Sequence, residues 1–404
     1  MANPSPASAS PTLADRAAIT LAERTPGLQW VRRPASAGSP PFDLAYVRTG
    51  PRTHTPIVVI PGGPGLASIL PYRDFRRWAT ARDLDIIMVE HRGVGLSRAD
   101  LDSRPLPFSA MWSSEVTHDI AAVLDREGVS QAVIAGSSYG SYLAASFGVT
   151  HPGRVAGTLM DSTLLSSRNI IVEREMVRAT LWNAQNEVSE GIRRLALNVP
   201  QPELLDVTRA AYELGGPELL LSLVRSRLHY RFHPAWSALA KYSMRGTSLT
   251  RIPCVYDFAL AGAIGFRELD YAPPPDGLPF DPALTYAAIA ERFPPFEGTP
   301  LDLATQVSRF PWPTVFLAGS RDLRTPPIVA RRLAEGSMNA MLVDITNGHS
   351  ALDTDPLVFL TCLQYLVGGR QRELPDLTDR LKALPRLGSA ERFAGALRAL
   401  LRLQ

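Results

Sequence analysis

The feature that most limits how this chain can fold is a short pattern centred on residue 138. An apolar run, Ala132–Ala135, leads into GSSYG at 136–140, and small or apolar residues follow as far as Val149. Gly-x-Ser-x-Gly between an apolar strand and a helix is typical of a sharp, strained turn that exposes its central serine. The flanking glycines let backbone segments approach closely. The pattern therefore predicts a strand, a turn at Ser138 and a helix.

The same turn predicts chemistry at Ser138. A serine at a helix N-terminus lies beside free N–H groups, which favour a developing negative charge. A serine in this place is typical of a nucleophile that attacks a carbonyl carbon. Ser137 lies outside the frame of the pattern, and local hydrogen bonding is the role expected for it.

Five more short apolar runs resemble the one before Ser138. Apolar on both faces, they predict buried parallel strands: Ile57–Ile60, Ile86–Val89, Val155–Met160, Thr314–Ala318 and Met341–Ile345. Helical patterns lie between them: Ser113–Glu127 with Ser113 or Ser114 as its N-cap, Ser138–Val149, Pro327–Glu335 and Leu352–Val367. This alternation predicts an α/β fold with a mostly parallel central sheet flanked by helices.

The alternation divides the chain into three parts. Residues 1–164 are expected to form the first part of an α/β core, with 1–25 as a flexible leader. Residues 165–305 predict a largely helical cap, and its Pro- and aromatic-rich segment Tyr271–Phe296 is expected to form an apolar pocket. Residues 306–404 are expected to complete the core and to end in a helical tail, whose amphipathic end predicts packing or a subunit contact.

Composition excludes several classes of function. The chain has 42 basic and 39 acidic residues with no basic block, so we expect no nucleic-acid partner. No stretch approaches 18 apolar residues, which argues against a membrane span. Residues 1–12 lack the pattern of a signal peptide, and the two cysteines suit a reducing compartment, so a cytoplasmic location is expected. No Cys/His cluster has zinc spacing, and neither a metal nor an organic cofactor is predicted.

A glycine-rich loop after the first parallel strand predicts the second half of an oxyanion site. The loop reads PGGPG at 61–65. Proline has no N–H to donate, which leaves Gly62 and Gly63 as donors. We expect Gly63 to act together with the N–H of Tyr139, and Gly62 remains the alternative.

The order of the chain selects a base and an acid. In enzymes built around this turn, an Asp or Glu and then a His follow the serine. His349 lies in a loop after the last predicted strand, whereas His229 and His233 lie in the insertion. Asp322 follows the strand at 314–318 by a short turn. The rival acids are Asp344, Asp353 and Asp355. The sequence thus predicts a catalytic triad of Ser138, Asp322 and His349.

Five segments in this order resemble the α/β-hydrolases of the prolyl iminopeptidase and tripeptidyl aminopeptidase group. They are PGGPG (61–65), EHRGVGLS (90–97), GSSYGSYLA (136–144), GSRDLRTPP (319–327) and NGHS (347–350). Prolyl iminopeptidases usually have His where Pro61 stands and Asp-Gln where Glu90 and His91 stand. The motif PGGPG, with proline at position 61, is similar to that of the tripeptidyl aminopeptidases in this group. The resemblance covers about 40–164 and 306–367 and is weak across the insertion.

The resemblance implies an α/β-hydrolase fold with a cap and a serine aminopeptidase that releases N-terminal residues from short peptides. In such enzymes acidic residues near the cap bind the free α-amino group of the substrate. Glu173, Glu175 and Glu268 are the candidates here. For His91, the family pattern implies a structural loop, although its position would also let it approach the site.

Two other functions fit the same residues. An esterase, amidase, lactonase or acyltransferase acting on a small metabolite would use the same triad. A non-catalytic binding protein would keep only the fold. The sequence does not predict an oligomeric state.

Overall fold

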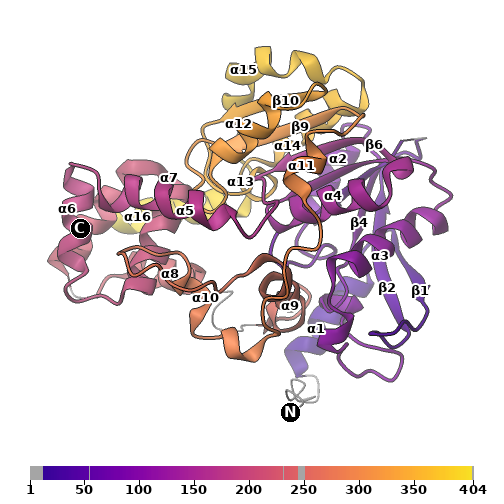
Figure 1. Cartoon of the computed structure of the whole chain (residues 1–404), viewed down its shortest axis with the longest axis horizontal. Coiled ribbons are helices and arrows are strands. Elements are labelled where there is room, and N and C mark those ends of the chain that lie inside the picture. The colour runs from indigo at the N-terminus through magenta and orange to yellow at the C-terminus, as the bar shows by residue number, and fades with distance from the viewer. Residues whose placement is uncertain (1–11, 54, 231, 244–250, 403–404) are drawn as a thin grey trace.

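The computed structural model describes residues 12–402 except 54, 231 and 244–250. Within these residues an eight-stranded sheet forms the centre of the molecule (Figure 1). In spatial order its strands are β1 (Leu28–Arg33), β2 (Phe42–Thr49), β4 (Ile86–Val89), β3 (Ile57–Ile60), β5 (Ala132–Ser137), β6 (Val155–Asp161), β9 (Thr314–Gly319) and β10 (Ala340–Ile345). The last six are parallel, which confirms the predicted mostly parallel sheet.

The two strands that the sequence analysis missed are antiparallel. β1 pairs with β2, and β2 pairs with β4. β1 has no fully buried residue and lies at the sheet edge, so it lacks the continuous apolar run by which the parallel strands were recognised.

Helices cover both faces of the sheet. One face packs against α3 (Ser113–Arg126), α4 (Tyr139–Thr150) and α11 (Leu303–Val307), and the other against α2 (Arg73–Thr80) and α14 (Pro356–Val367). α12 (Pro327–Glu335) joins β9 to β10, and the short α13 (Ala351–Thr354) precedes α14. The predicted helix over 113–127 is present, but no serine side chain caps it. The N–H of Ser113 instead donates to the carboxylate of Glu268, 2.9 Å away.

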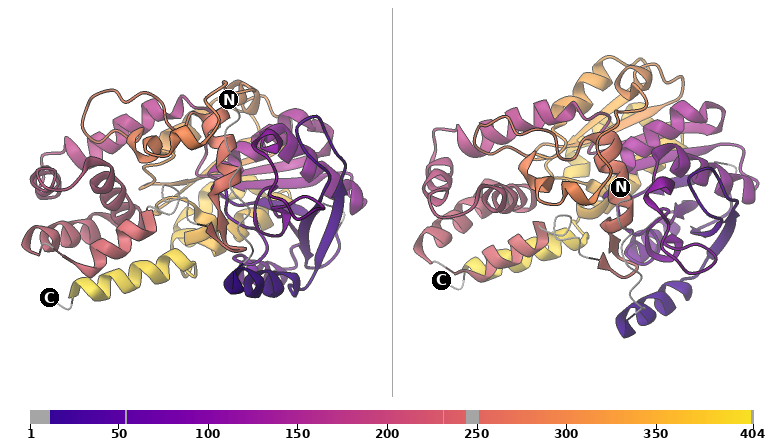
Figure 2. Two further views of the ribbon diagram at one scale, coloured as in Figure 1. Left: turned by 90° about the horizontal axis from the view of Figure 1, so that it is seen from below. Right: turned by 60° about the horizontal axis from the view of Figure 1, so that its bottom comes forward.

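The insertion forms a cap with its own apolar core. Its helices are α5 (Asn169–Val177), α6 (Glu187–Leu195), α7 (Gln201–His229), α8 (Pro234–Ser243), α9 (Phe258–Leu269) and α10 (Leu284–Ala287). α5 to α8 project to one side of the sheet (Figures 1 and 2). Two-residue strands, β7 (Arg251–Ile252) and β8 (Tyr256–Asp257), interrupt the otherwise helical insertion. α7 is kinked where Gly216, at φ 72°, precedes Pro217.

The C-terminal tail contacts both the core and the cap. α15 (Thr378–Lys382) stays beside β10, but α16 (Ser389–Arg402) packs against α7 and α8. Both views of Figure 2 show it running beside the cap helices. Ala390, Ala394 and Leu397 are buried in the apolar core of the cap. One face of α16 therefore packs into the cap, and packing is one of the two roles that the sequence predicted for the amphipathic tail.

The predicted flexible leader is a helix over part of its length. Leu13–Glu23 form helix α1, which starts with a capping box between Thr12 and Asp15. Ala22 is fully buried, and Asp15 forms an ion pair with Arg251 at 2.9 Å. Residues 1–11 of the predicted leader lie outside the described residues.

The described residues contain neither a helix suited to a membrane nor a metal-binding cluster. No helix there combines the length and apolar character needed to cross a bilayer. No group of three or more His, Cys, Asp or Glu side chains in the same part of the chain is arranged to hold a metal ion.

Candidate active site

The turn after β5 holds Ser138 in a strained conformation. Ser138 has φ 55° and ψ −121°, which non-glycine residues rarely adopt, and it immediately precedes helix α4. A side chain at Gly136 would collide with the carbonyl of Gly140, and one at Gly140 would collide with the carbonyl of Ile60. Both glycines are therefore required by close backbone approach, as the sequence predicted.

Two loops at the carboxyl end of the sheet bring a histidine and a carboxylate to Ser138. His349, after β10, places Nε2 2.9 Å from Ser138 Oγ. Its Nδ1 lies 3.0 and 3.1 Å from the two carboxylate oxygens of Asp322, which follows β9. The three side chains that the sequence nominated thus form one continuous hydrogen-bonded array.

The surroundings of the array keep Asp322 ionised. Asp322 is buried, and its carboxylate accepts hydrogen bonds from the N–H groups of Arg324 and Thr325 and from the Thr325 hydroxyl. Burial raises its pKa, but His349 and the two donors of Thr325 lower it by more, so the net shift is downward. Burial likewise lowers the pKa of His349, but the Asp322 carboxylate outweighs it and the net shift is upward from 6.5.

A second buried network ties the serine turn to the histidine loop. The Ser137 hydroxyl donates to Asp161 at 2.7 Å and lies 2.9 Å from the Ser350 hydroxyl. Asp161 also accepts the N–H groups of Ala351 and Leu352 at the start of α13. Ser137 therefore links the two loops, which is more than the local hydrogen bonding expected from the sequence.

The rival acids and bases have other partners. Asp344 pairs with Arg331, and Asp355 pairs with Arg386. Asp353 accepts hydrogen bonds from the hydroxyls of Tyr72 and Ser350. His233 accepts the N–H of Ala235 near the start of α8, and His229 lies at the end of α7. None of these groups contacts Ser138 or His349 in the described part of the chain.

The loop after β3 lies beside the serine. Gly62 and Gly63 line the same cleft as Ser138, and Gly63 has φ 129°, which only glycine adopts without strain. Among the described residues, none accepts a hydrogen bond from the N–H of Gly62, Gly63 or Tyr139. These N–H groups are therefore free to bind a ligand oxygen. The geometry leaves both Gly62 and Gly63 open as donors.

The cap holds this loop through its backbone. Ala67 N–H donates to the carbonyl of Val255 at 3.0 Å, and Asp257 N–H donates to the carbonyl of Gly65 at 2.8 Å. A side chain at Gly65 would come within 2.8 Å of the Asp257 carbonyl oxygen. The backbone at Asp257 therefore lies so close to the loop that only glycine fits at position 65. The loop packs between the cap and the core.

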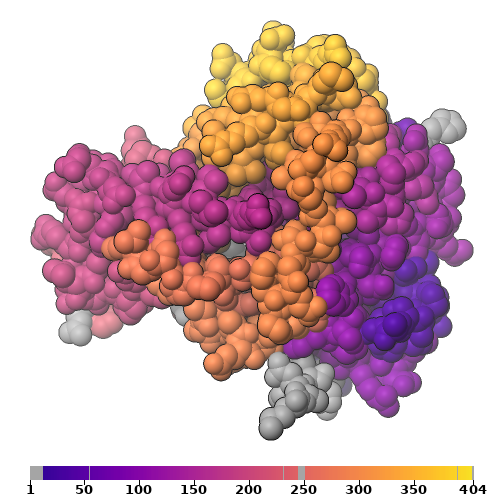
Figure 3. Space-filling view, viewed as in Figure 1, coloured from indigo at the N-terminus to yellow at the C-terminus, as the bar shows by residue number. Residues whose placement is uncertain are grey.

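A cleft of about 510 Å³ opens over Ser138 and His349. Its walls come from the core (Phe75 and Trp78), the cap (Glu213, Tyr242 and Tyr286) and the tail (Phe393). Phe393 of α16 stacks on Tyr242 of α8, with ring centroids 5.1 Å apart. In Figure 3 the orange segment that follows α9 lies between the pink cap helices and the purple core. The site is therefore shared by all three parts of the chain.

The three glutamates proposed to bind an amine have different surroundings. Glu268 is fully buried, accepts Ser113 N–H and Tyr142 O–H, and does not line the cleft. Glu175 is exposed and does not line the cleft either. The structure therefore contradicts the assignment of these two. Glu173 does not line the cleft either. It is half-buried, lies 2.7 Å from Arg209, and stays a candidate because its charge interacts with those of Arg324 and Glu213, which line the cleft.

The structure also reveals a carboxylate that sequence reasoning missed. Glu213 of α7 lines the cleft, accepts Leu323 N–H and pairs with Arg324 at 3.0 Å. The signal in the sequence was slight: Glu213 is one of several charged residues, Asp206 and Arg209 among them, in the helical stretch before the break at 215–217.

Charged groups around Glu173 and Glu213 carry a negative excess. Three carboxylates, those of Glu173, Asp206 and Glu213, meet two guanidiniums, those of Arg209 and Arg324. Burial raises the pKa of Glu173 to about 7, although Arg209 and Arg324 oppose the shift. A site with one surplus carboxylate favours a cation over an anion.

Comparisons with known proteins agree with this architecture. Residues 55–356 match the model of the α/β-hydrolase fold family. A probable proline iminopeptidase of Leptolyngbya boryana is 27% identical over 132 residues, and a proline iminopeptidase of Heyndrickxia coagulans is 26% identical over 149. These matches cover 32% and 36% of this chain, and only 38% and 43% of the relatives' own lengths.

Among solved structures, a thermophilic esterase from Thermogutta terrifontis superposes with a TM-score of 0.46 at 16% identity. The superposition covers 85% of this chain and 99% of the esterase.

Proposed function

This chain belongs to the α/β-hydrolase fold family, and we propose that it is a serine hydrolase that forms an acyl-enzyme on Ser138. The observation that carries the proposal is the array in which Ser138 Oγ, His349 Nε2 and Asp322 lie within hydrogen-bond distance in sequence. Ser138 attacks the carbonyl carbon while His349 takes its proton. His349 then gives that proton to the leaving group, and Asp322 holds the imidazole tautomer and stabilises the imidazolium.

The oxyanion is assigned to two backbone donors. The N–H of Tyr139 at the start of α4 supplies one, and Gly63 supplies the other, with Gly62 as its alternative. Each such donor typically contributes about 3 kcal/mol of transition-state stabilisation. Water then hydrolyses the acyl-enzyme and regenerates Ser138.

Within this class we assign an aminopeptidase that acts on short peptides. Two features support this choice: the partial similarity to proline iminopeptidases and the negative excess beside the cleft. A substrate ammonium near Glu173 and Glu213 would balance that charge. Both carboxylates are already bonded to arginines, so the ammonium would join an existing cluster.

The second candidate is a hydrolase of small esters, amides or lactones, or an acyltransferase. One observation favours it. Glu213, the glutamate that lines the cleft, already accepts hydrogen bonds from the Leu323 N–H and the Arg324 guanidinium. No carboxylate in that position is then free to select an amine. A non-catalytic binding protein has no such supporting observation.

A matched substrate panel separates the two candidates. Purified protein would be assayed on aminoacyl and tripeptidyl anilides with free N-termini, on their N-acetylated forms and on short-chain p-nitrophenyl esters, with Ser138→Ala as control. The aminopeptidase assignment expects turnover of the free-amine anilides that is lost on acetylation and in Ser138→Ala. Turnover of esters alone, dependent on Ser138, would move the assignment to the second candidate.

A panel with no turnover still leaves a direct test of the nucleophile. We expect a fluorophosphonate probe to label Ser138. A folded protein that neither turns over a substrate nor reacts with the probe would contradict the serine hydrolase assignment itself.

A further inference from the structure

A buried histidine outside the triad lies against the proposed oxyanion donor. His91 follows β4 in the loop that the sequence analysis regarded as structural, and only 9% of its surface is exposed. Its Nε2 lies 3.1 Å from the hydroxyl of Tyr139, and its Nδ1 lies 2.5 Å from the carbonyl oxygen of Arg92. The proposed mechanism has so far given His91 no role.

These two contacts define which atoms carry the protons. A carbonyl oxygen only accepts, so Nδ1 of His91 must carry the hydrogen that points at Arg92. Nε2 is then the unprotonated acceptor, and the Tyr139 O–H is its donor. Burial lowers the pKa of His91 to about 4 and raises that of Tyr139 well above 10, so neither group ionises near neutral pH. The protonation states that this hydrogen bond needs are therefore kept near neutral pH.

The buried hydroxyl of Tyr139 has one hydrogen-bond partner among the described residues, and that partner is His91. A small cavity of about 20 Å³, with room for about one water molecule, is lined by Tyr139 together with Gly62, Glu90, His91 and Leu143. The hydrogen bond to His91 is therefore the directional contact that fixes where the Tyr139 hydroxyl lies.

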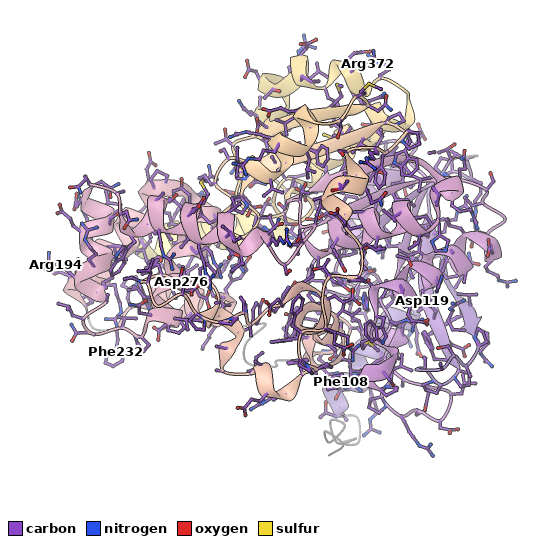
Figure 4. The ribbon with its side chains drawn as sticks, in the orientation of Figure 1. Phe108, Asp119, Arg194, Phe232, Asp276 and Arg372 are labelled. Carbon is purple, nitrogen blue, oxygen red and sulfur yellow. The ribbon has the colours of Figure 1, made fainter. Side chains whose placement is uncertain are left out.

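The acceptor itself is held rigidly. Next to His91, Arg92 is fully buried and forms a two-pronged ion pair with Asp119 of α3, at 2.7 Å for each bond. Its guanidinium also donates to the carbonyl of Ala110. Figure 4 labels Asp119 within the core. The Tyr139 ring, which is hydrogen-bonded to this loop, is therefore anchored to the core of the molecule.

We propose that His91 is a positioning residue that aims the backbone N–H of Tyr139 at the oxyanion. Tyr139 is the first residue of α4, so its ring and its N–H belong to the same turn that carries Ser138. The hydrogen bond ties the side chain of Tyr139, and through its Cα the first turn of α4, to the loop after β4. A variant that loses this tie lets the start of α4 shift, and a donor misplaced by about 1 Å costs roughly a hundredfold in rate. The inference rests on the proposed serine hydrolase function and adds to it a residue outside the triad.

Four variants test the inference, with kcat and KM on p-nitrophenyl acetate, the rate of fluorophosphonate labelling and the melting temperature as measurements. His91→Leu removes the acceptor, His91→Gln restores one, and Tyr139→Phe removes the donor. Tyr142→Phe is the matched control. It deletes an equally buried hydroxyl in the same turn of α4, but that hydroxyl donates to Glu268 at 2.8 Å instead of to His91.

We expect His91→Leu and Tyr139→Phe to lower kcat and the labelling rate by about ten- to a hundredfold with KM within about twofold. His91→Gln should recover most of this loss. Tyr142→Phe should lower the melting temperature and leave kcat within about twofold. The reason is that only the first two variants release the ring beside the oxyanion donor.

Two results would overturn the inference. One is an equal loss of kcat in Tyr142→Phe and Tyr139→Phe, in proportion to their melting temperatures, which would mark His91 as a packing residue. The other is wild-type kcat in Tyr139→Phe, which decides the question even where His91→Leu does not fold. An active Ser138→Ala protein would instead refute the proposed function, so the two failures are distinguishable.

Discussion

The core and the cap of this molecule fix their functional groups in different ways. In the core, backbone geometry places the reactive groups: the φ of Ser138, and glycines at 136 and 140 that no side chain can replace. In the cap, pairs of charged side chains join distant segments, such as Arg178 with Asp276, which is labelled in Figure 4. Arg174 likewise pairs with Asp281 at 2.8 Å.

This difference predicts how amino-acid substitutions in the two regions affect activity. Backbone geometry at the strand ends tolerates almost no substitution, because a side chain there meets a carbonyl group. Ion pairs between side chains do not depend on one backbone geometry, so a cap can vary while the core keeps its chemistry. We therefore expect substitutions in the core to affect every substrate and substitutions in the cap to affect some substrates only.

The largest effect is expected for Ser138→Ala. Loss of a catalytic serine typically costs about 10⁶-fold in kcat, because the covalent route disappears. Ser137→Ala is the matched control: it makes the same change one residue earlier and removes hydrogen bonds to Asp161 and Ser350 only. It should keep kcat within about tenfold. Comparable losses in both variants, measured on any turned-over substrate, would contradict the assignment of the nucleophile.

The next largest effect is expected for Asp322→Asn. An amide disfavours the required tautomer of His349, which typically costs about 10⁴-fold in kcat. His349 must be neutral to accept a proton, so wild-type activity should fall as the pH drops through a pKa above 6.5. Removing the carboxylate removes the group that raises this pKa, so the acidic limb of the kcat/KM profile should move to lower pH.

Asp344→Asn serves as the control for this change. It makes the same substitution in the neighbouring strand, where the carboxylate pairs with Arg331 instead of His349. An acidic limb that moves in both variants, or in neither, would argue against Asp322 as the partner of His349.

The contrast also explains what was predictable from the sequence. Gly136, Gly140 and the apolar strands act through local spacing, so the fold and the turn at Ser138 were accessible. The order of Asp322 and His349 along the chain, each in a loop after a predicted strand, then indicated the acid and the base. Glu213 contacts Leu323 across about 110 residues, and nothing local to either residue marks the contact. The N-cap of α3 was misassigned for the same reason, since Glu268 reaches Ser113 from another part of the chain.

A third prediction tests whether the tail belongs to the cap. Leu397 of α16 is fully buried in the apolar core of the cap, whereas Leu197, in the loop after α6, is 81% exposed. Leu397→Ala should cost about 2–5 kcal/mol of unfolding free energy, because it leaves a cavity. Leu197→Ala should cost less than about 0.5 kcal/mol. Equal denaturation midpoints for the two variants would contradict the packing of the tail in the apolar core of the cap.

The smallest expected effect concerns the cap and the choice of substrate. Glu173→Gln removes one carboxylate from the cluster beside the cleft while keeping the shape of the side chain. A hydrogen bond to a charged group contributes about 1.5–3 kcal/mol, so KM for free-amine anilides should rise roughly ten- to a hundredfold. KM for p-nitrophenyl esters should not change. Glu175→Gln, two residues away on an exposed side chain, is the control and should leave both values unchanged.

The pH dependence of KM sharpens the same test. Burial raises the pKa of Glu173 to about 7, so its carboxylate protonates as the pH falls below that value. An α-amino group stays charged below about pH 7.7. Affinity for free-amine substrates should therefore peak between these two values and weaken on the acidic side, and this acidic limb should vanish in Glu173→Gln. A limb that persists in the variant would arise elsewhere, and the cap would then select substrates by the shape of its aromatic walls instead of by charge.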